Sequence, residues 1–88
     1  MALSCALQSG DVLTLETFDG KLLVFSSPRA QAPGTPLRVR VDQNGAGLEL
    51  KSIGSRKRDD GMFELRARIT TMPSEVRSFL CAHFGIAE

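Results

Sequence analysis

The chain has 88 residues, of which 42% are hydrophobic and 24% are charged, and its formal net charge is +1. This length corresponds to one domain, here residues 1–88, with a single modest core. Too many residues are hydrophobic, and the net charge is too low, for a disordered chain. The near balance of charge also argues against a nucleic-acid polymer as partner, because such binding needs a one-sided basic surface.

Two cysteines, Cys5 and Cys81, lie near opposite ends of the chain. Their spacing fits neither a metal site nor a redox pair, and no secretory signal accompanies them, so free buried thiols are expected, with a disulfide as the alternative. No apolar run approaches the roughly 20 residues that a membrane helix needs. We therefore expect a cytoplasmic protein that does not insert into a membrane and carries no metal or cofactor.

The first clear hairpin is predicted from two neighbouring segments. Residues 12–18 alternate apolar with polar side chains, and residues 21–27 form a more continuous apolar run. Asp19-Gly20 between them is a turn signal, because both residue types tolerate positive φ. The preceding residues 2–8 are either a sixth strand or a loose arm, and the pattern leaves both open.

Three further strands follow a proline-rich loop at residues 28–34. Each alternates apolar residues with charged ones, which is typical of a sheet with one buried face. Asn44-Gly45 marks the turn between the first two of them. These strands are predicted at residues 36–41, 48–53 and 62–69.

The last element is predicted to be a helix over about residues 74–84. Ser74 is its expected N-cap and Gly85 its expected C-cap. One helical face is formed by Val76, Phe79, Leu80 and His83. Five or six short strands and one C-terminal helix predict a mostly β protein. We expect a small antiparallel barrel over about residues 2–69, with the helix covering one end or edge.

The segment 55–61, SRKRDDG, places three cations beside two anions. A phosphate cradle needs glycines that free backbone N–H groups, or a helix N-terminus. Here the one glycine is at the end, and Asp59 and Asp60 offset the cations. The segment is therefore interpreted as a solvated hairpin tip rather than a phosphate site, although such a tip can steer a partner electrostatically.

Eight of the 11 basic residues are arginines. Four of them fall on outward strand positions: Arg38, Arg40, Arg66 and Arg68. Cross-strand ion pairing with neighbouring glutamates on a wet sheet face is the favoured interpretation. The alternative is a face that binds a protein or an anion, because arginine is enriched at interfaces.

The helix offers a second candidate surface. Phe79 lies on the predicted buried stripe, and Phe84 borders it, so the apolar arc is wide. Deep packing on the barrel is the favoured interpretation, and a docking surface for another chain is the alternative. His83 is the only histidine and has no catalytic partner in the sequence. No metal cluster, phosphate loop or hydrolase spacing occurs, so an enzyme is not expected.

The order of elements resembles the second half of PilZ domains, which are small six-stranded barrels of bacterial signalling proteins, many of which bind cyclic di-GMP. The similarity covers about residues 11–84, with a "GT-x-L-x-L"-like strand after a proline-rich loop. It ends in a helix whose S-E-x-R-x-x-L sequence is similar to the family's "S-x-E-x-R-x-x-L" pattern. The matching positions are Gly34, Thr35, Leu37, Phe63, Leu65, Ser74, Glu75, Arg77 and Leu80.

Two departures concern the nucleotide site that the family implies. The RxxxR motif of nucleotide-binding members is absent from this sequence, and residues 1–28 contain no arginine. In the second motif, Thr17 and Gly20 can stand for the serine and glycine, but Leu15 replaces the acidic or amide residue. Each lost charge-assisted hydrogen bond costs about 1.5–3 kcal/mol of binding free energy. Two such losses therefore weaken the affinity for cyclic di-GMP by about a thousandfold or more.

The resemblance thus implies a non-catalytic signalling adaptor that contacts another protein without tight cyclic di-GMP binding. The residues expected to meet that partner are Arg66, Arg68, Phe79 and Phe84. Self-association into a homodimer is a further option, because small domains gain stability from it. The alternative is a cyclic di-GMP receptor with a non-standard site. Its ligand-binding residues would be Arg29, Arg38, Arg40, Arg56 and Arg58.

Overall fold

The computed structural model describes residues 2–43 and 45–86. Asn44 of the predicted Asn44-Gly45 turn lies outside these residues. The described elements are β1 (Leu3–Leu7), β2 (Val12–Phe18), β3 (Leu22–Ser27), β4 (Pro36–Val41), β5 (Gly47–Lys57), β6 (Phe63–Thr71) and α1 (Ser74–Phe84). This confirms the predicted mostly β fold with one C-terminal helix.

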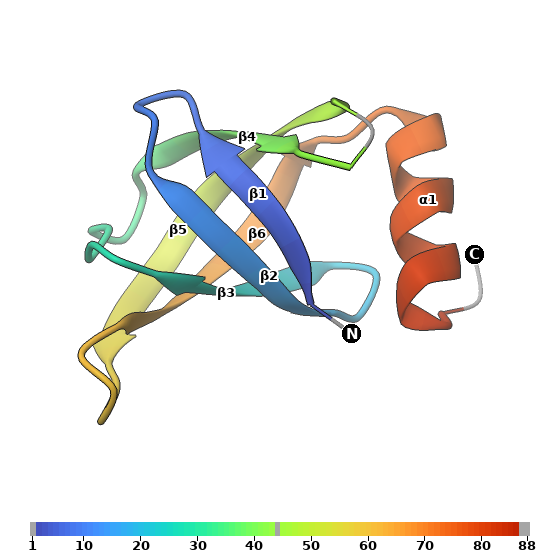
Figure 1. Ribbon diagram of the computed structural model, residues 1–88. Helices are drawn as coiled ribbons and strands as arrows, with labels where there is room; N and C mark the ends of the chain where they lie inside the picture. Colours follow the sequence, from blue (N-terminus) through green and yellow to red (C-terminus); the bar gives the residue numbers. More distant parts are fainter. Residues whose placement is uncertain (1, 44, 87–88) are drawn as a thin grey trace.

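The strands form a closed antiparallel barrel in the order β1-β2-β3-β6-β5-β4 (Figure 1). Residues 2–8 do contribute a sixth strand, since β1 pairs with β2 on one side and with β4 on the other. Cys5, for example, lies opposite both Leu13 and Val41. Without β1 the sheet would be open between β2 and β4.

The inside of the barrel is filled by the apolar set of each alternating strand. Leu37, Val39 and Val41 on β4 are buried, whereas the residues between them are exposed. The largest fully buried side chain is Phe25 on β3. The alternation read from the sequence therefore assigns the inner and outer faces correctly for this strand, because side chains on a strand point to opposite faces in turn.

Helix α1 lies beside one end of the barrel, next to the β2–β3 turn (Figure 1). Its buried residues are Val76, Leu80 and Cys81. Arg77 links the helix to the β2–β3 turn, because its Nη1 donates a hydrogen bond to the carbonyl of Gly20 at 3.1 Å. No helix among the described residues is long and apolar enough to cross a membrane.

The predicted N-cap of this helix was wrong by one residue. Pro73 occupies the N-cap position, and no side chain caps the helix by a hydrogen bond. The extended proline (φ −57°, ψ 146°) turns the chain out of β6, and its carbonyl accepts hydrogen bonds from the N–H groups of Val76 and Arg77. Ser74 is consequently the first helical residue. The predicted C-cap is confirmed, since Gly85 adopts the left-handed conformation at φ 69°.

Strand β5 is longer than predicted, and the hairpin tip is correspondingly shorter. Residues 55–57 still pair with β6, with Lys57 opposite Phe63. The tip is closed by a hydrogen bond from the Arg58 N–H to the Met62 carbonyl at 2.7 Å and by one from the Met62 N–H to the Asp60 carboxylate at 2.9 Å. Pairing with β6 extends the strand into a charged segment that local propensity assigns to a turn.

The loop between β3 and β4 protects the edge that this extension creates. Strand β4 pairs with β5 only as far as Lys51. Beyond it, the Gly34 N–H donates to the Ser52 carbonyl at 2.7 Å, and the Ser52 N–H donates to the Thr35 carbonyl at 2.8 Å. The backbone of Gln31 adds hydrogen bonds with the hydroxyl of Ser55. The loop therefore takes the place of a missing strand at this edge.

Replacing Leu80 by alanine should lower the free energy of unfolding by about 2–5 kcal/mol, because a fully buried leucine would leave a cavity between α1 and the barrel. Urea denaturation followed by circular dichroism measures this loss. The control Ala82→Ser, on the exposed side of α1, should change stability by less than about 0.5 kcal/mol. A Leu80→Ala loss no larger than that of the control would show that α1 does not seal the barrel.

Candidate functional site

The five predicted ligand arginines do not gather in one place. Two adjoining depressions, open to solvent, run along the outside of β1, β4 and β5, with volumes of about 880 and 700 Å³. Arg29 lines the first, Arg40 lines the second, and Arg38 lines both. Neither is lined by Arg56 or Arg58, which lie at the far end of β5 and in the β5–β6 hairpin.

Carboxylates share these depressions with the arginines. Asp11 and Glu49 line the first, and Asp42 and Glu49 line the second. The Nε of Arg29 lies 3.5 Å from the Oδ1 of Asp11, although 74% of the Arg29 side chain stays exposed. An anionic ligand would therefore meet carboxylates as well as arginines here, and the depressions are poorly suited to a ligand with two phosphates.

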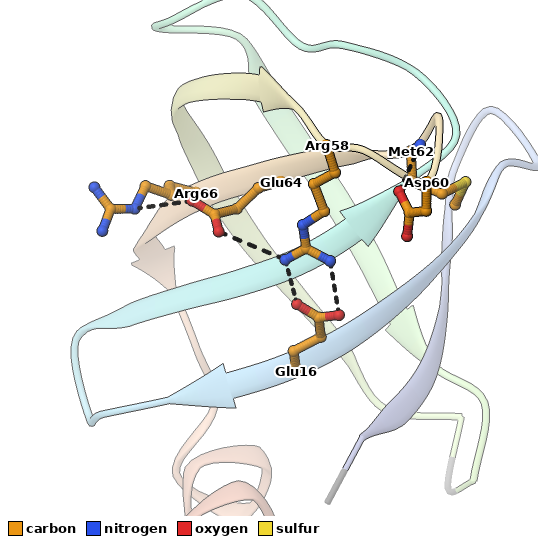
Figure 2. Close-up of polar contacts among 6 residues, drawn as sticks. All are labelled: Glu16, Arg58, Asp60, Met62, Glu64 and Arg66. Carbon is orange, nitrogen blue, oxygen red and sulfur yellow. Dashed lines mark hydrogen bonds and ion pairs between the residues drawn. The ribbon is translucent and has the colours of Figure 1, made fainter.

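Arg58 is engaged in a contact that the sequence did not reveal. Figure 2 shows its guanidinium reaching across β3 to Glu16 on β2. Its Nη1 donates to one carboxylate oxygen of Glu16 at 2.8 Å, and its Nη2 contacts the other. The same Nη2 lies 3.6 Å from Glu64 on β6. These three side chains, called the Arg58 clasp below, tie the β5–β6 hairpin to β2.

The charges of the clasp stabilise one another. The hydrogen bond from Arg58 lowers the pKa of Glu16 below its ordinary value, against the opposing effects of burial and of the Asp60 charge. The same hydrogen bond raises the pKa of Arg58 above its ordinary value. Arg58 is thus held by two carboxylates, through charge-assisted contacts that link the hairpin to the barrel.

The outer surface of β5 and β6 carries cations in an unusual register. Lys51 on β5 lies directly opposite Arg68 on β6. The next residues in this cross-strand row are Pro36 on β4, opposite Lys51, and Leu22 on β3, opposite Arg68. Neither of them is charged. Like charges directly opposite each other on neighbouring strands are destabilising. Neither cation takes part in an ion pair among residues 2–43 and 45–86, so the fold holds a pair of like charges side by side on its surface.

The predicted cross-strand ion pairs on this face were wrong. Arg38 lies opposite Glu49, yet the ion pairs among the described residues do not include this pair. Arg66 approaches only Glu64, its neighbour two residues away on the same strand, at 3.9 Å (Figure 2). Glu64 is shared with Arg58, which leaves Arg66 weakly compensated and 58% exposed.

Two exposed aliphatic side chains flank these cations. Leu22 on β3 is 36% exposed, and Ile53 on β5 is 44% exposed. Ile53 is turned outward by a β-bulge between Ser52 and Gly54. Glycine inside a strand pattern signals such a bulge, so Gly54 was the available hint in the sequence. We call the outward residues Leu22, Lys51, Ile53, Arg66 and Arg68 the basic wall.

The aromatic residues of α1 are largely used for packing. Phe79 and Phe84 are partly buried and lie against the core. Both contact the ring of His83, Phe79 in a stacked arrangement at 6.1 Å between centroids and Phe84 edge-on at 4.9 Å. The helix therefore offers less free apolar surface to a partner than its sequence suggested.

The two cysteines lie in the buried interior of the protein. Both are free and buried, which confirms the predicted thiols. Burial, with a further contribution from the Asp42 charge, raises the pKa of the Cys5 thiol to about 11, so this thiol stays protonated at neutral pH. Residues 2–43 and 45–86 contain no group of three or more histidine, cysteine, aspartate or glutamate side chains that could hold a metal ion.

No family model, curated protein or solved structure matches this chain. The likeness to PilZ domains therefore rests on the residue pattern alone.

Replacing Glu16 by glutamine should lower the free energy of unfolding at neutral pH by about 0.5–1 kcal/mol, because the clasp is partly exposed and its carboxylate is lost. The folded-state pKa of Glu16 is lowered, so the contribution is fully present above the ordinary glutamate pKa and is lost as pH falls through the lowered value. Urea titrations of both proteins across the acidic range measure the difference.

The control for this experiment is Asp59→Asn, which removes a carboxylate from the same hairpin outside the clasp. Its stability should follow that of the parent protein at every pH. A Glu16→Gln deficit that does not shrink on acidification would contradict the assignment of the clasp.

Replacing Lys51 by glutamate should stabilise the protein by about 0.5–1 kcal/mol, because a repulsive cross-strand pair with Arg68 becomes an attractive one. Thermal melting should show Tm rising by a few degrees. Lys57→Glu, the same substitution on the same strand opposite Phe63, should bring no such gain. Equal effects of the two substitutions would show that the Lys51–Arg68 register carries no electrostatic cost.

Proposed function

We propose that this chain is a non-catalytic adaptor domain of PilZ-like type that acts in bacterial signalling, in the cytoplasm, by contacting another protein. The observation that carries the proposal is the basic wall, in which Lys51 and Arg68 face each other without a carboxylate in their row. A surface that keeps a repulsive pair beside exposed aliphatic groups has the composition of an interface, where arginine is enriched.

The closed barrel and its terminal helix agree with the fold that the PilZ resemblance implies. The interior is filled by apolar side chains, so ligands are left to the outer surface. The only histidine contacts two phenylalanine rings, and the Cys5 thiol is protonated and buried. These features favour a binding role over a catalytic one.

The runner-up is an anion receptor, and one observation favours it. Arg29, Arg38 and Lys51 line the larger depression together with the hydroxyl-bearing Thr35. Arginine forks suit phosphates, so this surface is where a nucleotide would be sought. Against it stand the carboxylates of Asp11 and Glu49 in the same depression, and the absence of Arg56 and Arg58 from its lining.

Calorimetric titration with cyclic di-GMP at physiological salt should give no detectable heat, and the melting temperature should not move. A receptor saturated at 100-fold excess over Kd would instead gain about 2.7 kcal/mol of stability. Heat that fits a micromolar or lower Kd would overturn the adaptor function in favour of the receptor function. Alanine variants of Arg29 and Arg38 would then locate the site.

The adaptor itself is tested by affinity capture followed by reconstitution. The whole chain, immobilised, should retain at least one bacterial protein that, once purified, binds it again with defined stoichiometry by calorimetry. The proposal would be contradicted if no captured protein, once purified, bound the purified chain again. A complex of the chain with itself at micromolar concentration in analytical ultracentrifugation would assign the interface to a homodimer instead.

A further inference from the structure

Resting on the adaptor function above, we propose that the basic wall binds a short acidic segment of the partner protein, in extended conformation, with carboxylates at alternating positions and aliphatic residues beside them.

The spacing of the wall cations sets the form of the segment. Arg66 and Arg68 are two residues apart on β6, which separates them by about 6.6–6.8 Å along the strand. Acidic residues at alternate positions of an extended peptide have the same spacing and point to the same side. Lys51 lies beside Arg68 in the next strand, so the second carboxylate would meet two cations at once.

The exposed aliphatic residues of the wall favour aliphatic side chains beside the carboxylates of the bound segment. Leu22 lies in register with Arg68 on the β3 side. Ile53 lies in the bulge beside Gly54, which is in register with Arg66 on the β5 side. Aliphatic side chains of a segment running along β6 can therefore reach apolar surface on either side of the two arginines.

A carboxylate lies at each end of the wall. Glu49 precedes Lys51 on the outer face of β5, and Glu64 precedes Arg66 on the outer face of β6. These two carboxylates mark the ends of the wall along the strands, where Glu49 lies opposite Arg38 and Glu64 lies opposite Arg56. A segment with two or three carboxylates matches the wall cations between these two positions.

Peptide display tests the proposal directly. The whole chain is immobilised and panned against a random dodecapeptide library, and enriched peptides are titrated by fluorescence anisotropy at two salt concentrations. We expect peptides with acidic residues at alternating positions next to aliphatic ones, and affinities that fall with added salt.

Three charge variants locate the site. Lys51→Glu and Arg68→Glu should each weaken the selected peptides by about tenfold or more, which corresponds to one close charge pair. Lys57→Glu, which lies outside the wall, should leave the affinity within about twofold. Each variant is first shown to melt cooperatively, and Lys51→Glu is expected to melt no lower than the parent, so lost binding cannot be ascribed to unfolding.

Several results would overturn the proposal. These are the enrichment of neutral or basic peptides, the absence of any enrichment, or equal losses in Lys57→Glu and the wall variants. Wall-dependent binding to vesicles containing phosphatidylserine, with no acidic peptide selected, would assign the wall to a membrane surface instead. If a purified partner still binds the chain while no acidic peptide does, the wall assignment fails and the adaptor function stands.

Discussion

The pairing of β1 with β4 closes the sheet on itself, because β1 also pairs with β2 and so joins the two ends of the strand order. Three register pairs, from Cys5 with Val41 to Leu7 with Val39, make this junction. Closure gives every apolar face of the strands a common interior and removes the edges that would otherwise attract other chains. The helix and the β3–β4 loop then cover what closure leaves exposed, namely one end and the far part of β5.

A filled barrel can offer only its outer surface to a ligand, and register decides which charges become neighbours there. In one part of this surface the arginines are neutralised, as in the Arg58 clasp with Glu16 and Glu64. In another part the register sets Lys51 against Arg68. The same residue types therefore stabilise the fold at the clasp and cost stability at the wall. An unfavourable pairing of like charges is the kind of local conflict that proteins keep at functional surfaces, where binding of a partner compensates for the lost stability.

Much of the fold was accessible from the sequence. Alternation assigned the inner and outer faces of β4, and the positive-φ preference of Gly85 marked the end of α1. The candidate site was accessible only in part. The outward arginines on β6 were identified, but the grouping of five arginines into one ligand site was not reproduced, since Arg58 turns to Glu16 at a sequence separation of 42 residues.

By itself the sequence determined the elements, because strand period, turn chemistry and helix spacing act over a few residues. The tertiary structure alone decided the closure by β1, the extension of β5 into the charged segment, the outward position of Ile53 and the opposition of Lys51 to Arg68. Each of these depends on which strand supplies the partner for a given backbone hydrogen bond. That choice is made by the packing of the whole barrel, and no local pattern encodes it.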